Sequence, residues 1–264
     1  MEIVLIVLLG FVFGSFINAL VWRLRHKRDM WHERSECTHC RHVLAWYDLV
    51  PFFSWLSLGG KCRYCHRRIE DHPLVEVITP IIFVVSYLVW PYGWNLTGYV
   101  AFGLWLIALI VLIALAVYDL RWYVLPDVMV FPLTVIGLVL GLIIRINFGS
   151  SDLYMAAIDM AGGVFVIAGL YWALYQLSQG RYVGYGDVKL SVFIGLLVGW
   201  QGALLSLMLA NFLGLLFVLP GLLLGKLTPK SKIPFGPFLI AACIMAFLWG
   251  ESIINWYTLS ILGL

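Results

Sequence analysis

Long continuous apolar runs dominate the chain, and few stretches alternate between apolar and polar positions. A run of about 18 apolar residues or more is typical of a membrane-spanning helix, whereas the strands of a membrane barrel alternate. The pattern predicts eight transmembrane helices, at residues 3–22, 74–91, 96–118, 128–146, 154–177, 188–200, 202–225 and 234–250. The tail 252–264 is amphipathic, which suits a segment that lies along the interface.

Composition supports this interpretation. Of the 264 residues, 62% are hydrophobic and only 12% are charged, which leaves too little polar surface for a soluble domain of this length. The sequence therefore predicts an all-α polytopic membrane protein. Its first apolar run precedes the basic stretch RLRHKR instead of following one, so we expect a retained helix and not a cleaved signal peptide.

The basic residues predict the orientation. Ten of the 17 Lys and Arg residues fall in the loop 23–73. Other basic residues lie at loops on the same side, at Arg121, Arg181, Lys189, Lys226, Lys230 and Lys232, and only Arg145 lies opposite. By the positive-inside rule this side is cytoplasmic, and both termini face outward.

The loop 23–73 contains two Cys-x2-Cys pairs, Cys37 with Cys40 and Cys62 with Cys65. Four soft thiolates at this spacing are typical of a structural zinc site, which would stabilise a loop too short to build its own core. Two disulfides or a redox couple are the alternatives, and a reducing cytoplasm disfavours disulfides. Three nearby histidines could replace a cysteine ligand, namely His39, His42 and His66. We expect Cys243, in the last run, to be a buried apolar thiol.

Two acidic residues are candidates for catalysis. Asp119 ends the third predicted helix and Asp187 begins the sixth, so two crossings return them to one face of the membrane. An ionisable residue at that depth indicates a functional site, although each could simply mark where a helix leaves the membrane. Gly184 and Gly186 precede Asp187 and permit a close approach of the backbone.

A pair of aspartates that shares one proton can hydrolyse a peptide bond. Helix dipoles suggest that Asp119, at a helix C-terminus, is neutral and that Asp187, at an N-terminus, is the anion. Asp127 competes with Asp119 for the role of partner, but its position before the fourth run suits a helix cap. Asp159 is expected near the interface.

These motifs together resemble the type IV prepilin peptidases, bilobed membrane aspartic proteases of the GxGD class. The similar segments are GSFINALVWRL from Gly14, the cysteine segment with LAWYDLVPFFSWLSLGGKCRYCHRRI, YDLRWYVLPD, GYGDVKL and IPFGPFL from Ile233. The resemblance places Asp119 and Asp187 at the two catalytic positions. It implies cleavage of basic leaders from prepilins and pseudopilins at the cytoplasmic face of the bacterial inner membrane.

The resemblance also implies methylation of the new N-terminal amine with S-adenosylmethionine. Gly60, Lys61 and Glu76 match family positions that would serve this second activity. The implied organisation is a first helix at 1–22, a zinc-binding segment linked to methylation at 23–73, and a helical peptidase core at 74–264. Expected partners are the pilin substrates and membrane lipid, with no nucleic acid.

Some alternatives remain open at this point. Pro234, Phe235, Gly236 and Pro237 form a PFGP segment that either holds substrate backbone or only begins the eighth helix. The aspartates could relay protons in a transporter, although transport sites usually lie nearer the middle of the membrane. A thiol oxidoreductase and a non-catalytic scaffold are further alternatives.

Overall fold

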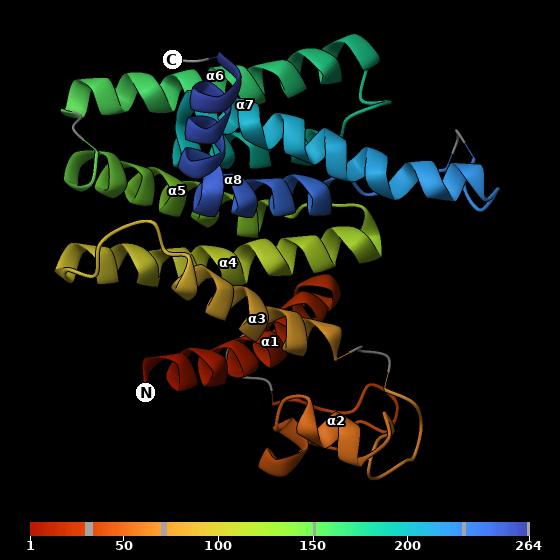
Figure 1. The fold of residues 1–264 in the computed structure, drawn as a ribbon. Helices are drawn as coiled ribbons and strands as arrows, with labels where there is room; N and C mark the ends of the chain where they lie inside the picture. Colours follow the sequence, from red (N-terminus) through yellow and green to blue (C-terminus); the bar gives the residue numbers. More distant parts are fainter. Residues whose placement is uncertain (30–33, 70–72, 150–151, 229–230, 263–264) are drawn as a thin grey trace. The chain divides into compact units, whose positions relative to one another are not determined.

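The chain is almost entirely helical, as the apolar pattern predicts. The computed structural model describes residues 1–29, 34–69, 73–149, 152–228 and 231–262, so Lys230 lies outside the described residues. The helices are α1 (Glu2–His26), α2 (Phe53–Ser57), α3 (Leu74–Leu88), α4 (Leu96–Trp122), α5 (Asp127–Asn147), α6 (Leu153–Ser178), α7 (Tyr185–Leu223) and α8 (Gly236–Tyr257) (Figure 1). A 3-10 turn, η1, covers Trp46–Leu49, and a π turn, η2, covers Thr258–Leu262.

Six of these helices are long and apolar enough to cross a membrane, namely α1, α4, α5, α6, α7 and α8. The difference from eight predicted helices has two causes. The predicted run 74–91 becomes α3, which has 15 residues. The predicted runs 188–200 and 202–225 are two helical parts of α7, which carry one label although a break at Gly199 separates them, as the sequence predicted. The tail does not form a separate amphipathic segment from residue 252, because α8 continues to Tyr257.

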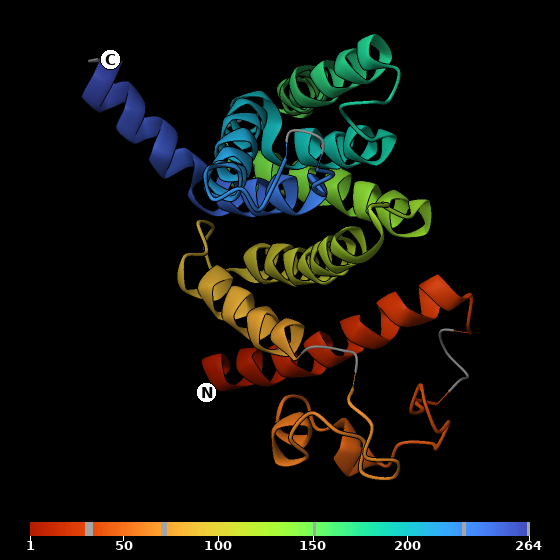
Figure 2. The ribbon, with the colours of Figure 1, turned by 90° about the vertical axis from the view of Figure 1, so that its right-hand side faces the viewer.

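The described chain divides into two compact units, Met1–Leu88 and Val89–Leu264. The first unit contains α1, the cysteine loop and α3, and α3 packs across α1 (Figure 2). The structure thus groups residues 74–88 with the first helix, whereas the sequence analysis grouped them with the peptidase core.

The second unit is a bundle of α4 to α8. In Figure 1, α5 lies between α4 and α6, and it contacts both helices. Trp105 of α4 stacks on Phe247 of α8 with ring centroids 4.1 Å apart, and Trp105 is fully buried. Burial of such large side chains is a major source of packing energy between these helices.

A break at Gly199 divides α7 into two helical parts. Gly199 has φ 71° and ψ −173°, a backbone conformation that only glycine adopts without strain. Arg145, in the last turn of α5, donates hydrogen bonds to the carbonyl of Leu197 at 3.1 Å and to the Asp159 carboxylate at 2.6 Å. Asp159 in turn accepts from the backbone N–H of Trp200 at 3.2 Å.

These two charged side chains satisfy one carbonyl, that of Leu197, and one N–H, that of Trp200, beside the break. The cation lies at the C-terminus of the first part and the anion at the N-terminus of the second, which is the favourable sign for each helix dipole. Asp159 is therefore a structural residue of the helix break and not only an interfacial one. Arg145 likewise has a specific structural partner on the side opposite most basic residues.

We expect Gly199→Ala to destabilise the second unit strongly. An added Cβ would lie 2.1 Å from Asp159 Oδ2 and 2.5 Å from Arg145 Nη2, so the partly buried ion pair would have to shift. The backbone strain of a side chain at φ 71° costs on the order of 1–3 kcal/mol, and disturbing this partly exposed pair adds less than the roughly 3–5 kcal/mol of a fully buried one. Unfolding in detergent, followed by circular dichroism, measures the loss.

Gly103→Ala is the matched control, because a Cβ at helical Gly103 meets no atom within 4 Å. It should be neutral or slightly stabilising, since alanine favours helix more than glycine does. Equal stability of the two variants would show that the Arg145–Asp159 contact does not hold the break.

Candidate functional site

Asp119 lies in the last turn of α4 with its side chain buried at the N-terminus of α8. The residue is 6% exposed, and its Oδ2 accepts a hydrogen bond from the backbone N–H of Gly236 at 3.1 Å. A Cβ at residue 236 would lie 2.6 Å from that oxygen, so only glycine permits this approach. The PFGP segment thus begins α8 and also presents a backbone donor to Asp119.

Asp187 occupies the first turn of α7 and is 9% exposed. Its Oδ2 accepts a hydrogen bond from the backbone N–H of Gly184 at 3.3 Å, which closes the turn before the helix. Gly186 faces the segment between α4 and α5, where an added Cβ would lie 3.0 Å from Leu125 Cβ. The GYGD sequence therefore places Asp187 close against the end of the Asp119 motif.

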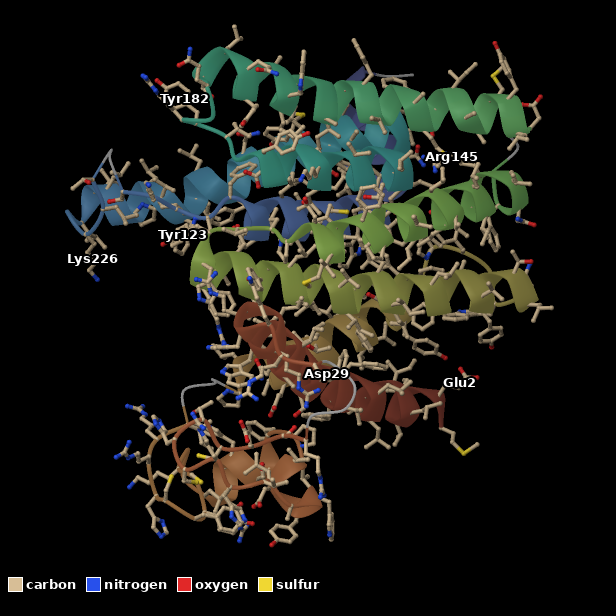
Figure 3. The ribbon with its side chains drawn as sticks, turned by 180° about the vertical axis from the view of Figure 1, so that it is seen from behind. Glu2, Asp29, Tyr123, Arg145, Tyr182 and Lys226 are labelled. Carbon is tan, nitrogen blue, oxygen red and sulfur yellow. The ribbon has the colours of Figure 1, made fainter. Side chains whose placement is uncertain are left out.

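The structure brings the two aspartates together. They are the only acidic residues that are buried in the described part of the chain, and the charge of Asp119 acts on Asp187. Tyr123, just after α4, and Tyr182, just before α7, lie at one end of the second unit, and Arg145 lies at the other (Figure 3). Two buried carboxylates within electrostatic range favour sharing of a single proton.

The division of roles that helix dipoles suggested is not confirmed by the structure. Asp187 lies in the first turn of α7, as predicted. Asp119 ends α4, but its carboxylate also accepts from the first N–H of α8. Each carboxylate therefore meets the positive end of a helix, and the dipoles do not distinguish the two.

Asp127 is not a helix cap. The cap position of α5 is Pro126, and Asp127 is the first helical residue. Its exposed carboxylate pairs with Lys189 Nζ at 2.5 Å, two residues after Asp187. The ion pair of Asp127 with Lys189 therefore joins the Asp119 motif to the Asp187 motif, outside the buried pair of Asp119 and Asp187.

Tyr171 of α6 is a neighbour of the pair that sequence reasoning missed. The residue is 4% exposed, and its hydroxyl has no hydrogen-bond partner among the described residues, although the Asn211 carboxamide is nearby. Asp187 acts on it electrostatically, and its ring lies 5.8 Å from that of Phe235 in the PFGP segment. A polar atom inside an otherwise apolar run was the signal available in the sequence.

The four loop cysteines are positioned to bind a metal ion. Their sulfur atoms all lie within 4.8 Å of one another, and Cys37 Sγ is 3.9 Å from Cys65 Sγ. Zinc bound tetrahedrally at about 2.3 Å from each sulfur requires sulfur atoms roughly 3.8 Å apart. The cysteines therefore fit zinc, and among the described residues no histidine joins this cluster.

The two cysteine pairs are folded in the same way. Cys37 and Cys62 each donate a backbone hydrogen bond to the residue five positions later, and each accepts one from the residue four positions later. Arg41 and His66 occupy the equivalent fourth positions with φ 56° in both. Burial of the Cys37 thiol is outweighed by the backbone N–H groups of Cys40 and His39, which lower its pKa to about 7, whereas burial raises the pKa of the neighbouring Cys62 thiol. Without a metal, Cys37 therefore ionises before Cys62.

Two protein-family models match this chain, and each match covers most of one compact unit. Residues 8–90 match the bacterial peptidase A24 N-terminal domain, and residues 106–219 match the type IV leader peptidase family. A protein of Aeromonas salmonicida named prepilin leader peptidase/N-methyltransferase is 33% identical over 98% of this chain and 94% of its own length. The chain belongs to the type IV prepilin leader peptidase family.

Other relatives of the same name extend the similarity. The protein of Pectobacterium carotovorum is 32% identical over 88% of this chain and 87% of its own length. The protein of Pseudomonas aeruginosa is 31% identical over 95% of this chain and 91% of its own length. No solved structure matches the chain. A prepilin peptidase is a multi-pass protein of the bacterial inner membrane, which agrees with the six apolar helices.

The three residues predicted to serve methylation lie on two segments of the first unit. Gly60, with φ 71°, lies beside the Trp55 ring, and the backbone of Lys61 forms an isolated antiparallel β-bridge with Arg68 across the second cysteine turn. Glu76, in the first turn of α3, accepts a hydrogen bond from the backbone N–H of Phe52 at 2.6 Å. Glu76 also lines a cavity of the first unit that Gly60 and Lys61 do not line.

Proposed function

We propose that this chain is an aspartic endopeptidase that removes the basic leader from type IV prepilins and pseudopilins. The observation that supports this most strongly is the pairing of Asp119 and Asp187, the only buried carboxylates among the described residues. Membership of the prepilin peptidase family supports the same reaction. This family membership gives no support to the alternative function of a proton-coupled transporter.

In this mechanism the pair holds one proton. The ionised carboxylate takes a proton from water as the water attacks the scissile carbonyl carbon, and the protonated carboxyl donates to the carbonyl oxygen. The carboxyl group that took the proton from water then donates it to the leaving amine as the C–N bond breaks. The other carboxylate takes a proton from a hydroxyl of the tetrahedral intermediate as the carbonyl re-forms, which restores the singly protonated pair. The Gly236 N–H and the Gly184 N–H each hold one carboxylate oxygen and so orient the pair.

The substrate must present extended backbone to this pair, because a helical amide is shielded by its own hydrogen bonds. A pilin precursor is a basic leader followed by an apolar helix, so its cleavage point lies where that helix leaves the membrane. Pro234 and Pro237 have no backbone N–H to donate. The first two residues of PFGP lie before α8, which begins at Gly236, so they are outside regular helix. We assign this segment to holding the substrate backbone beside Asp119.

We further propose that both active sites face the cytoplasm and that the first unit methylates the new N-terminal amine. The basic loop between α1 and α3 supports the cytoplasmic placement. The relatives' names support methylation, with S-adenosylmethionine as the methyl donor. The four cysteines would supply all the ligands that a zinc ion takes at a structural site, so zinc held there would stabilise the loop and would take no part in the reaction.

Both activities can be tested with one purified preparation. The full chain in liposomes should cleave a prepilin between its basic leader and its apolar helix. With labelled S-adenosylmethionine present, it should then transfer the label to the new N-terminus. Mass spectrometry of the product distinguishes the outcomes. Absence of cleavage would contradict the peptidase proposal, and cleavage without label would contradict methylation alone.

A further inference from the structure

The cysteine loop lies along the apolar helix α1 and not beyond its end. The Phe53 ring of α2 lies 6.1 Å from the Phe11 ring of α1, measured between ring centroids, and Figure 2 shows α2 beside this helix. Pro51 of the loop lines a cavity together with Val12 and Phe16 of α1. The loop therefore lies beside the middle of a helix that is long and apolar enough to cross a membrane.

The contact of Phe53 with Phe11 lies deep in the membrane. Arg23 is the first basic residue of α1, and basic residues at the end of such a helix lie at the level of the headgroups. Phe11 precedes Arg23 by 12 residues, which is about 18 Å along the helix axis. A tilt of about 40°, the upper end of the usual range, still leaves roughly 14 Å. Since half of the hydrocarbon layer is about 15 Å thick, a residue beside Phe11 lies in the apolar interior of one leaflet.

The loop segment beside α1, residues 46–57, exposes large apolar side chains. The exposed ones are Trp46, Tyr47, Leu49, Val50, Phe53 and Leu56. The exposed fraction is 79% at Trp46 and 58% at Leu56. Val12 and Phe16, one turn apart on α1, are exposed as well. Exposed apolar side chains gathered in this way indicate a contact with a partner or a membrane.

The backbone of this segment is suited to an apolar environment. The N–H groups of residues 53, 54, 56 and 58–61 donate to carbonyls of residues 50–58. The N–H of Phe52 donates to the Glu76 carboxylate at 2.6 Å, and Pro51 has no N–H to donate. Lipid offers no hydrogen-bond partner, so backbone inside a membrane must satisfy its polar groups within the protein. These bonds meet that requirement, although α2 has only five residues.

The two cysteine turns, residues 36–43 and 61–68, lie on either side of this segment and are basic. They contain five exposed basic residues, Arg41, Lys61, Arg63, Arg67 and Arg68, and one acidic residue, Glu36. Arg63 donates to the Asp48 carboxylate at 2.8 Å, which joins the second turn to η1. A basic surface beside an apolar one matches the anionic headgroups and the acyl chains of a single leaflet.

From these observations we propose that residues 46–57 are embedded in the leaflet at the C-terminal end of α1, with the two cysteine turns on its anionic headgroups. Lipid covers the apolar side chains that the segment exposes. The cysteine loop is thus a membrane-embedded element and not a soluble domain tethered to α1. The peptidase and methyltransferase proposals do not depend on this placement, and only the name of the leaflet, cytoplasmic, rests on the orientation proposed above.

Two added tryptophans test the placement in the full chain, supplied with zinc and reconstituted into liposomes that contain phosphatidylglycerol. Leu56→Trp adds an indole at an exposed position of α2. Val43→Trp is the matched control, because Val43 is also exposed, at 43%, but belongs to the first cysteine turn. The fluorescence gained over the unmodified chain is measured with bromine on the lipid acyl chains or with iodide in the water. Bromine should quench the added signal of Leu56→Trp more strongly than iodide does, and Val43→Trp should show the opposite order.

Three other results would overturn the proposal. Quenching of Leu56→Trp by iodide as strong as that of Val43→Trp would place α2 in water. Quenching by neither agent would show that another part of the chain covers the segment instead of lipid. Equal quenching of the two variants by brominated acyl chains would contradict the separate places assigned to α2 and to the cysteine turns.

A charge at the same position gives a second test with a local readout. Leu56→Asp should raise hydrogen exchange of the amides of residues 52–61 by up to roughly 100-fold in liposomes, because a carboxylate in hydrocarbon favours the open segment. Val43→Asp should leave the exchange of these amides unchanged. Unchanged exchange in Leu56→Asp would contradict the embedding, whereas the result with Leu56→Trp does not depend on how well Leu56→Asp folds.

The lipid composition tests the role of the basic turns. Amides of residues 36–43 and 61–68 should exchange more slowly in liposomes with phosphatidylglycerol than in liposomes of neutral phosphatidylcholine alone. The combined change Arg67→Gln and Arg68→Gln should reduce that difference, since both side chains are exposed. Equal exchange of the unmodified chain in the two kinds of liposome would overturn the assignment of the cysteine turns to anionic headgroups.

Discussion

Asp119→Asn and Asp187→Asn should each reduce prepilin cleavage by roughly 10⁴-fold or more, with the protein still folded. Neither amide can exchange the proton that the mechanism requires, while size and shape are nearly unchanged. In each variant the new carboxamide oxygen can still accept the backbone N–H, of Gly236 or of Gly184, that the native carboxylate accepts. The double variant should be no slower than either single variant, because the pair acts as one unit. Cleavage rates in liposomes, measured across pH, should give a bell-shaped profile for the unmodified chain.

Two other aspartates serve as controls. Asp152 caps α6 by accepting from the Met155 N–H, a role that asparagine fills equally well, so Asp152→Asn should cleave normally. Asp127→Asn should keep substantial activity, because the carboxamide oxygen can still accept from Lys189 and the pair it loses is largely exposed. Near-normal cleavage by Asp119→Asn together with loss in Asp127→Asn would show that the catalytic pair is misassigned.

Removal of the metal should abolish methylation and leave most of the cleavage activity. Purified protein should carry about one zinc per chain, and replacing Cys37 and Cys40 with serine should remove it. Binding of structural zinc contributes on the order of 10 kcal/mol to such small domains, so the cysteine loop should lose its fold. Arg63 and Tyr64, which lie between Cys62 and Cys65, donate hydrogen bonds to the Asp48 carboxylate, so that loss should reach the rest of the first unit. Metal analysis, labelled methyl transfer and prepilin cleavage measure the three effects separately.

Cys243→Ala is the control for this second prediction, because Cys243 is fully buried in α8 and lies outside the cysteine cluster. It should keep the same zinc content as the unmodified chain. Protein that contains no zinc after careful preparation would contradict the metal assignment. Cleavage lost to the same extent as methylation would contradict the separation of the two activities between the compact units.

Much of the fold follows from local sequence pattern. The helical class and the cysteine cluster depend on hydrophobic run length and on the Cys-x2-Cys spacing, both of which are local. The proximity of Asp119 and Asp187 follows from counting crossings between them. The division of α7 at Gly199 agrees with the two predicted runs 188–200 and 202–225. The contacts of Arg145 and Asp159 with the break were not predicted, because both residues come from other helices.

The finer parts of the site depend on tertiary packing. The contact of Asp119 with the Gly236 N–H joins residues 117 positions apart, and no local pattern encodes it. Asp127 was interpreted as a cap because proline and aspartate commonly precede helices, whereas its actual partner, Lys189, lies on another helix. Tyr171 went unnoticed because it is a single polar residue within a long apolar run.

The break at Gly199 has a consequence for the surroundings of the aspartate pair. The part of α7 from Tyr185 to Val198 has about 14 residues and is therefore only about 21 Å long, against roughly 30 Å for the hydrocarbon layer of a typical membrane. None of its residues from Asp187 onward is exposed, so neighbouring helices and not lipid cover this short part. The depth of Asp187 is therefore set by protein packing and not by the thickness of the membrane.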